Sequence, residues 1–166
     1  ITWYRREITK YPAITVKLNT EIGNVADLDA DEIIVATGST PNRIPVKGVE
    51  HGILATDFLL GKQPVGDRVT IIGGGLTGCE IAYELYLQGK KPAIVEMLDD
   101  LICTPGICLA NTSFLRDFFK ANNVPVYLET GVTKIDDFVV TVKDKDGNTT
   151  ELKADDVILS VGYKPA

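Results

Sequence analysis

The sequence has few of the residues that carry metal and nucleophile chemistry. It contains one histidine, His51, and three cysteines among 166 residues. A single histidine excludes a metal site built from several histidines of this chain. The odd number of cysteines, without zinc-ligand spacing, is typical of a reduced, cytoplasmic chain. We therefore expect no metal site and no catalytic residue within these residues.

Two of the cysteines, Cys103 and Cys108, are spaced as C-x4-C. This spacing is open to a redox pair, but neither a glycine-rich FAD motif nor a histidine lies near it. The third cysteine, Cys79, begins an apolar helical pattern and is expected to be a small packed residue. The sequence leaves the role of the C-x4-C pair open.

An excess of positive charge and long apolar runs are also missing. The chain has 17 lysines and arginines against 23 acidic residues, a net charge of −6, and the basic residues are scattered. This distribution argues against nucleic-acid binding. No apolar run approaches the roughly 18 residues of a membrane helix, and no signal-peptide core opens the chain. We expect a cytoplasmic segment of a longer protein that binds neither nucleic acid nor membrane.

A glycine-rich turn is the most informative feature that is present. The apolar run Val69–Ile72 is typical of a buried strand, and it leads into G-x-G-x-x-G at Gly73, Gly75 and Gly78. Gly73 permits the tight turn, Gly75 leaves room for a phosphate, and Gly78 lets the following helix pack on the strand. The helix N-terminus then offers unpaired N–H groups to an anion. The pattern predicts a cradle for a dinucleotide pyrophosphate.

An acidic residue at the end of the next strand completes the motif. Glu96 ends the run Pro92–Glu96 and lies 18 residues after Gly78, close to the spacing of about 20 expected of a ribose ligand. Its carboxylate accepts hydrogen bonds from ribose hydroxyls and repels a 2′-phosphate. The residues that follow, beginning with Met97, include no early lysine or arginine. The sequence therefore favours NAD(H) over NADP(H).

An internal repeat indicates where domains end. Residues 31–42 align without gaps on residues 155–166, an offset of 124. Each copy has an acidic residue, an apolar strand, a glycine turn and a proline, with Gly38 in the first copy and Gly162 in the second. A glycine and a proline after a strand take the chain out of the sheet, at a place where the backbone passes close to a bound group. The chain thus has two domain ends and one glycine-rich beginning.

Periodicity and turn residues predict alternating helices and strands, and hence an α/β fold with a parallel sheet. An Asp146-Gly147-Asn148 turn predicts an antiparallel hairpin added to it. The expected helices are 2–10, 55–60, 76–88 and 109–122, and the expected strands are 13–18, 32–36, 68–72, 92–96, 125–129, 139–143, 149–153 and 157–161.

The motifs NTEIG, DEIIVATGSTPNRIP, VTIIGGGLTGCEIAYELYLQGKKPAIVEM and DDVILSVGYKP follow one another in this order. Together they resemble the FAD/NAD(P)-dependent pyridine nucleotide oxidoreductase superfamily. The nearest branch is the 2,4-dienoyl-CoA reductase, enoate reductase and NADH:flavin oxidoreductase family, and the resemblance covers nearly the whole chain. It implies a Rossmann-like FAD/NAD(P)-binding fold, a parallel sheet with helices and a three-stranded antiparallel β-meander.

The resemblance also implies a domain plan and a set of binding residues. Residues 1–48 would be the C-terminal remnant of a discontinuous FAD-binding domain, 49–66 a linker and 67–166 the NAD(H)-binding domain. Glu80 would lie toward the nicotinamide, and its alternative role is that of a solvated helix carboxylate. The implied cofactor-binding residues are Gly73, Gly74, Gly75, Leu76, Thr77, Gly78, Glu80, Glu96, Met97 and Gly162.

By resemblance, the chain is the NADH-binding domain of a flavin-dependent oxidoreductase and is inactive alone. Hydride would pass from NADH to FAD, and in the full-length enzyme through FMN to an enoate or dienoyl acceptor. FAD, an FMN barrel and an iron–sulfur cluster would then belong to other regions of the same polypeptide. A disulfide reductase or NADH oxidase of the same architecture is an alternative. A non-catalytic NAD-sensing module is an alternative of another class.

Overall fold

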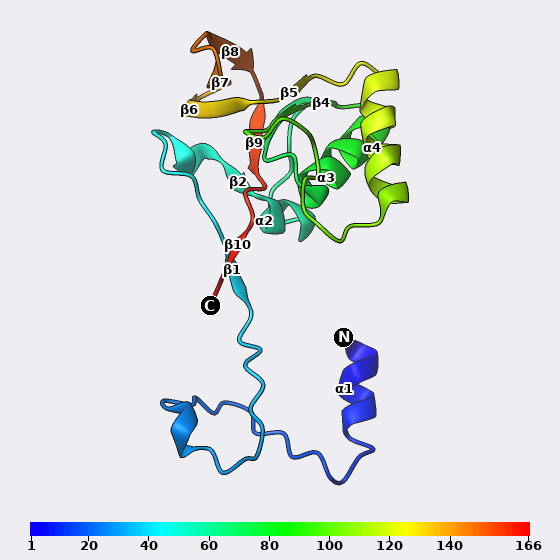
Figure 1. Cartoon of the computed structure of the whole chain (residues 1–166), viewed down its shortest axis with the longest axis vertical. Helices are drawn as coiled ribbons and strands as arrows, with labels where there is room; N and C mark the ends of the chain where they lie inside the picture. Colours follow the sequence, from blue (N-terminus) through cyan, green and yellow to red (C-terminus); the bar gives the residue numbers. More distant parts are fainter. The chain divides into compact units, whose positions relative to one another are not determined.

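The structure is a computed structural model that describes residues 1–166. The contacts within it divide the chain into two units, Ile1–Ala36 and Thr37–Ala166 (Figure 1). All of the buried residues belong to the second unit. No helix of the chain has the length and apolar character needed to cross a membrane. The predicted domain boundaries at residues 48 and 66 stay predictions.

The first unit contains two short helical segments and no strand. Helix α1 (Thr2–Ile8) confirms the predicted N-terminal helix, and a 3-10 turn, η1, covers Val25–Asp27. The strands predicted at residues 13–18 and 32–36 do not form, and Ile34 is 90% exposed. A strand needs a partner for its backbone N–H and C=O groups. No β-pairing joins either segment to another part of the chain, so the strand prediction was wrong here.

The second unit is built on a parallel sheet of five strands in the order β2-β9-β3-β4-β5. The strands are β2 (Ile53–Leu54), β3 (Arg68–Ile72), β4 (Lys91–Val95), β5 (Val126–Tyr127) and β9 (Asp156–Leu159). The sequence predicts all of these except β2, which lies in the segment expected to be a linker and pairs with β9. The sheet confirms the Rossmann-like α/β class.

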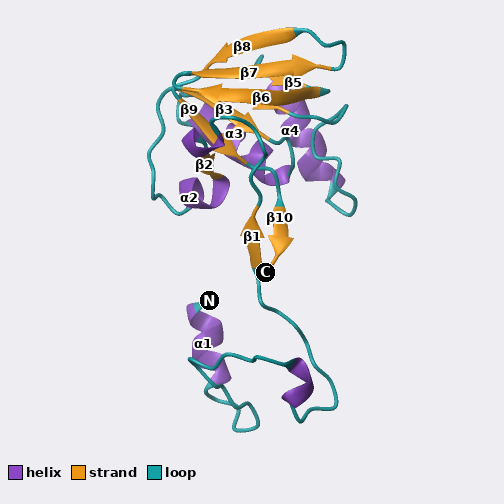
Figure 2. Ribbon diagram, turned by 90° about the vertical axis from the view of Figure 1, so that its left-hand side faces the viewer, coloured by secondary structure: helices purple, strands orange, loops and turns teal.

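Helices and a second sheet cover opposite faces of this parallel sheet (Figure 2). Helices α3 (Leu76–Leu87) and α4 (Leu109–Ala121) pack in one cluster with Ile71 of β3. The next residue, Ile72, belongs to the cluster formed with the antiparallel sheet. Successive side chains of a strand point to opposite faces, so one apolar run supplies both layers of the core. The short helix α2 (Ala55–Leu59) confirms the predicted helix beside β2.

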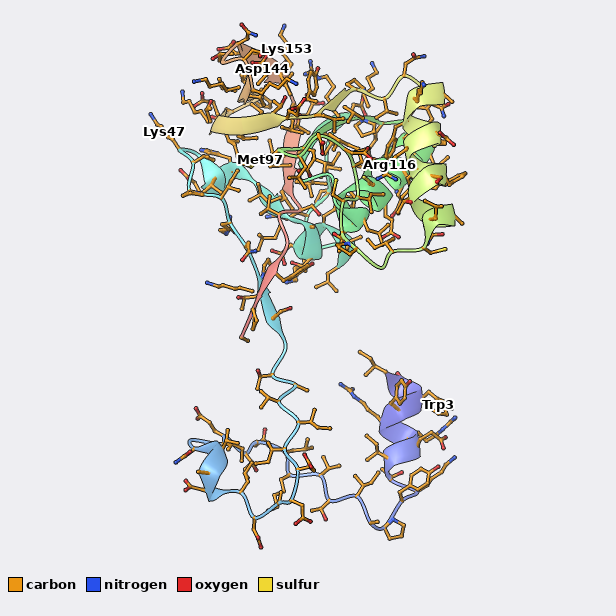
Figure 3. All side chains as sticks on the ribbon, viewed as in Figure 1. Trp3, Lys47, Met97, Arg116, Asp144 and Lys153 are labelled. Atoms are coloured by element: carbon orange, nitrogen blue, oxygen red, sulfur yellow. The ribbon has the colours of Figure 1, made fainter.

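The second sheet is the three-stranded antiparallel meander that the resemblance implies. Its strands are β6 (Thr130–Asp136), β7 (Val139–Asp144) and β8 (Thr149–Lys153). The β7–β8 turn forms as predicted: Gly147 has φ +88°, and Asp144, labelled in Figure 3, accepts hydrogen bonds from the backbone N–H groups of Asp146 and Asn148. Strand β6 was not predicted, because a bulge between Val132 and Lys134 interrupts its alternation.

The two copies of the internal repeat pair with each other. Strand β1 (Ser39–Pro41) and strand β10 (Tyr163–Pro165) form an antiparallel ribbon in which Ser39 lies opposite Pro165. The Ala166 N–H donates to the Gly38 carbonyl over 3.1 Å, and this bond continues the ladder. The similarity seen in the sequence is therefore also a physical contact between segments more than a hundred residues apart.

An ion pair joins the start of β3 to the residue before β9, and it predicts a pH dependence. The Arg68 guanidinium donates to the Asp155 carboxylate over 2.6 Å, and the Arg68 backbone N–H donates to the same carboxylate over 2.8 Å. These bonds lower the pKa of Asp155 to about 2. Because the pKa of Asp155 is lower in the folded state than in the unfolded state, its carboxylate stabilises the fold at a pH above the ordinary pKa of an aspartate. This stabilisation is lost as the pH falls through the folded-state pKa.

We therefore expect Asp155→Asn to lose less stability than the wild type between about pH 5 and about pH 2. Urea unfolding at both pH values measures the difference. Asp117→Asn is the control, because Asp117 is exposed and makes no ion pair or side-chain hydrogen bond; its pH dependence should follow the wild type. Parallel curves for Asp155→Asn and the wild type would remove Asp155 from the acid response.

Candidate nucleotide-binding site

A cavity of about 760 Å³ opens at the carboxyl ends of β3, β4 and β9. Ligands of open α/β sheets bind at this edge, because the loops that leave the strands surround it. The wall is mostly apolar, and Glu96 is its only charged residue. The lining residues are Pro41, Ile44, Pro45, Val46, Ala55, Thr56, Ile72, Gly73, Gly75, Leu76, Thr77, Val95, Glu96, Met97, Leu98, Thr104, Ile107, Thr130, Val132, Leu159, Ser160, Val161, Gly162 and Tyr163.

Gly73 makes the tight turn that leads from β3 into the cavity wall. Its φ is +102°, a conformation that L residues rarely adopt. A Cβ built on Gly73 would lie 2.3 Å from the Ser160 carbonyl oxygen. The Gly73 N–H donates to the Val95 carbonyl over 2.9 Å, which fixes the turn to the end of β4. Conformation and space both require glycine here.

Gly78 brings α3 against this turn. It is buried in the first turns of the helix, and a Cβ there would lie 2.0 Å from the Gly73 carbonyl oxygen and 3.3 Å from Ile71. The nearer neighbour is a backbone oxygen of the turn, and the other is a side-chain methyl of the buried strand residue Ile71. The close approach of the helix to the strand therefore depends on the missing side chain.

Gly75 has a different environment from the other two glycines of the motif. It is the N-cap residue of α3, with φ −68° and ψ 178°, a conformation open to any residue, and a Cβ there would meet nothing within 4 Å. No side chain caps this helix end, so the unpaired N–H groups and the helix dipole are available to an anion. The open space at Gly75 faces the cavity and fits a phosphate group.

Glu96 reaches from the end of β4 to the glycine turn. Its Oε2 accepts a hydrogen bond from the Gly74 N–H over 2.6 Å, and its Oε1 accepts one from the Leu98 N–H over 2.9 Å. A Cβ on Gly74 would lie 3.0 Å from the Glu96 Cβ and 2.5 Å from Leu101. The half-buried carboxylate thus lies beside residues 73–78, the glycine turn and helix start that the sequence predicts as a phosphate cradle. Met97, labelled in Figure 3, follows Glu96 and is an exposed residue of the wall.

The charge of the cavity wall is negative. None of the lining residues is a lysine or an arginine. A phosphate group close to the Glu96 carboxylate would therefore have no cation of the wall to balance it.

Residues 2–166 match the pyridine nucleotide-disulphide oxidoreductase family. This chain belongs to that family. The relatives are oxidoreductases. A cinnamate reductase of Clostridium sporogenes is 36% identical over 98% of this chain and 25% of its own length. An NADH oxidase of Thermoanaerobacter brockii is 35% identical over 85% of this chain and 22% of its own length.

Among solved structures, a 2-naphthoyl-CoA reductase superposes with a TM-score of 0.69 at 25% identity, over 77% of this chain and 19% of the other.

This chain spans about a quarter of the length of the cinnamate reductase and of the NADH oxidase. The comparisons support the superfamily that the resemblance named, while the dienoyl-CoA reductase branch stays a prediction.

The structure brings together most of the residues that the sequence proposed for this family's nucleotide. Those that line the cavity are Gly73, Gly75, Leu76, Thr77, Glu96, Met97 and Gly162. Gly74 is buried in the turn, and Gly78 is buried in the first turn of α3. Glu80 lies exposed on α3 and is not part of the wall. Gly162 has φ +80°, and its carbonyl accepts a hydrogen bond from the Asn42 N–H over 2.9 Å.

Sequence reasoning missed the parts of the wall that carry no motif. They come from the segment after β1, from the loop before α4, and from β6. The first copy of the repeat ends at Asn42, before the first of these segments. Thr104, Ile107 and Thr130 have no signal in the sequence, since tertiary folding alone carries them to the cavity.

Cys79 lies directly behind the cradle, where it is chemically inert. Its Sγ donates to the Gly74 carbonyl over 3.3 Å, and the residue is buried. Burial, with a smaller effect of the Glu96 charge, raises the pKa of the thiol to about 12. The thiol stays protonated at neutral pH, so Cys79 is the small packed residue that the sequence predicts.

Proposed function

We propose that this chain is the NADH-binding part of a flavin-dependent oxidoreductase. One observation carries the proposal: the open space at Gly75 and the uncapped start of α3 adjoin the Glu96 carboxylate in a cavity without lysine or arginine. The helix end would hold the pyrophosphate through backbone N–H groups. Glu96 would accept hydrogen bonds from the adenosine ribose hydroxyls and disfavour a 2′-phosphate.

NADH, when bound, supplies hydride, and the residues of this chain bind and orient it. The apolar wall, with residues such as Ile44, Val46 and Val161, would exclude water around the remainder of the nucleotide. The residues present show no glycine-rich FAD motif. We therefore assign no step on the flavin to this chain.

In the full-length enzyme, hydride would pass to FAD and then through FMN to an enoate or dienoyl acceptor, with an iron–sulfur cluster among the other regions. The similarity to cinnamate reductase supports this acceptor class, since cinnamate is an enoate. The partners of this chain would then be the dinucleotide, the FAD domain and an FMN barrel of the same polypeptide.

A second candidate is the corresponding part of an NADH oxidase or a disulfide reductase. The 35% identity to an NADH oxidase and the 32% identity to a dihydrolipoyl dehydrogenase favour it. The two candidates share the nucleotide site and differ in the acceptor. Activity of the full-length enzyme with an enoate or with oxygen as acceptor separates them.

Titration with NADH and NADPH tests the nucleotide assignment. We expect the wild type to prefer NADH, and we expect Glu96→Ala to weaken NADH binding about tenfold, as for a lost hydrogen bond to a charged group. The preference over NADPH should shrink in the same variant. Glu84→Ala is the matched control, since Glu84 is exposed on α3 and is not part of the wall. Absence of NADH affinity, or a preference for NADPH that persists in Glu96→Ala, would show that Glu96 is not the ribose ligand.

A further inference from the structure

A second cavity opens at the amino ends of β3 and β4, at the sheet edge opposite the nucleotide cavity. Its volume is about 440 Å³, within the range of roughly 300–1,000 Å³ that is typical of small-molecule sites. Strand β8, the end of α3 and the segment between α4 and β5 complete its wall. None of its lining residues belongs to the wall of the nucleotide cavity. The two cavities are therefore separate.

The inner part of this cavity lies between the two sheets. Ile72 of β3 faces the antiparallel sheet, and side chains two residues apart on a strand share a face. Thr70 and Arg68 therefore point to the same side as Ile72. On β4, Lys91 lies beside Arg68, and Ala93 lies beside Thr70. Thr70 and Ala93 are thus the inner pair, while the exposed Arg68 and Lys91 lie at the edge where the cavity opens.

Thr70 brings an unused hydroxyl group to this cavity. Three polar side chains of the chain are buried, and two of them, Thr112 and Thr130, donate to backbone carbonyls over 3.1 and 2.7 Å. The third, Thr70, is 2% exposed and forms no side-chain hydrogen bond within the protein. No side-chain polar atom that is wholly enclosed lacks a partner, so the Thr70 hydroxyl reaches the cavity surface. A bound group that hydrogen-bonds to it would remove the cost of burying it alone.

The rim of the cavity has a local excess of positive charge. Its cations are Arg68, Lys90, Lys91 and Lys153, against one carboxylate, that of Glu151. Lys153, labelled in Figure 3, comes from β8. The chain as a whole has a net charge of −6, so the cations at this edge run against the overall balance.

Two of the four cations are already bound by the protein. Arg68 forms the ion pair with the residue before β9, and Lys90 Nζ donates to two backbone carbonyls of the loop before β3 over 2.8 and 3.0 Å. Lys91 and Lys153 are exposed and form no ion pair. Their ammonium groups are therefore free to bind an anion at the mouth of the cavity.

Apolar side chains line the space between the sheets. Leu152 of β8 belongs to the core cluster formed with the antiparallel sheet, Tyr127 of β5 packs against that cluster, and both line the cavity. Thr70 lies two residues beyond Arg68 along β3, a rise of roughly 6–7 Å. A flat apolar body of that length, such as one benzene ring, therefore fits between the charged rim and the hydroxyl.

We propose that this cavity binds a small aromatic carboxylate that has a hydrogen-bonding group opposite its carboxylate. The carboxylate would accept charge-assisted hydrogen bonds from Lys91 and Lys153. The ring would lie against Tyr127 and Leu152, and the group opposite the carboxylate would accept a hydrogen bond from Thr70. This site goes beyond the proposed function and does not depend on it.

Calorimetric titration of the chain with 4-hydroxybenzoate tests the site. Two analogues each remove one contact, because benzoate lacks the hydroxyl group and 4-hydroxybenzamide lacks the charge. We expect 4-hydroxybenzoate to bind about fivefold more tightly than benzoate, as for one hydrogen bond, and about tenfold more tightly than the amide. Absence of binding, or equal affinity for the three probes, would overturn the proposal.

Variants of the lining residues assign the contacts. Thr70→Val should abolish the preference for 4-hydroxybenzoate over benzoate, and Lys91→Gln or Lys153→Gln should reduce the preference over the amide several-fold. Lys143→Gln is the matched control, because Lys143 is an exposed lysine of β7 that forms no ion pair and lies outside the cavity wall. Undiminished preferences in the three lining variants, or an equal loss in Lys143→Gln, would place the probe elsewhere and overturn the proposal.

Unfolding experiments show whether the Thr70 hydroxyl is free. Thr70→Val should unfold at or above the wild-type midpoint, because valine has a similar shape and the lost hydroxyl has no partner in the protein. Thr112→Val should unfold below it, because this variant loses the bond to the Leu109 carbonyl. A lowered midpoint for Thr70→Val would show that the hydroxyl is bonded within the protein, which contradicts its assignment to a ligand.

Saturating NADH separates this site from the proposed function. NADH should leave the Kd for 4-hydroxybenzoate unchanged, because no residue lines both cavities. Competition between the two would place the probe in the nucleotide cavity and overturn the proposal. If NADH fails to bind while 4-hydroxybenzoate binds as expected, the proposed function fails and this site stands.

Discussion

Gly78→Ala is expected to lower the free energy of unfolding by about 3 kcal/mol, toward the upper end for overpacking in a core. The added Cβ would lie 2.0 Å from the Gly73 carbonyl oxygen. That oxygen cannot move away easily, since Gly73 has φ +102° and its N–H is bonded to Val95. Relief would need α3 to shift away from β3 and open the core around Ile71. Thermal unfolding should show a midpoint lowered by roughly 6–12 °C.

Gly131→Ala is the control for this substitution. A Cβ on Gly131 meets nothing within 4 Å, and the residue has no positive φ. Its effect should stay within about 0.5 kcal/mol, as for a surface change. Equal midpoints for Gly78→Ala and the wild type would contradict the view that helix-to-strand contact depends on this glycine.

Elements with a local signal were predictable from the sequence. Strand β3, helix α3 and strand β4 follow one another with an apolar run, a glycine motif and a helical pattern, and each signal lies within the element itself. The hairpin at Gly147 was predictable for the same reason, because its turn residues fix the backbone. Local signals thus accounted for the cradle and for Glu96.

Features that depend on a partner were not predictable. Residues 13–18 and 32–36 have the apolar pattern of strands. Such a pattern indicates which side chains would share a buried face, but it does not indicate which strand would pair with the segment. Strand β2 is the opposite case, since two residues become an edge strand only because β9 lies beside them. Strand β6 is hidden by its bulge. In each case tertiary pairing, absent from a linear reading, decides the outcome.

The cavity shows the same division. The sequence identified the glycines and the acid because their chemistry requires those residues at that spacing. It could not identify Thr104 or Ile107, because ordinary residues become part of a wall only when the loop is folded against the cradle. The repeat lies between these cases: Gly38 and Gly162 were visible as a pair, but the antiparallel contact of β1 and β10 was not.

Gly75→Val should weaken nucleotide binding about 100-fold and leave the fold intact. The backbone of Gly75 has φ −68° and ψ 178°, which valine adopts without strain, and its Cβ meets nothing within 4 Å. The midpoint of unfolding should therefore stay close to that of the wild type. The added side chain would occupy the space where a phosphate approaches the start of α3, so the Kd for NADH should rise about 100-fold, or roughly 2.7 kcal/mol.

Fluorescence titration with NADH, together with thermal unfolding of the same samples, separates the two roles of the motif. Gly75→Val should affect binding alone, and Gly131→Val should leave binding unchanged because Gly131 lies outside the cavity wall. Gly78→Ala should lower the unfolding midpoint first, and any loss of binding should follow from the shifted helix. Unchanged NADH affinity in Gly75→Val would place the pyrophosphate elsewhere, since no dinucleotide can lie against this helix end with a branched side chain in its path.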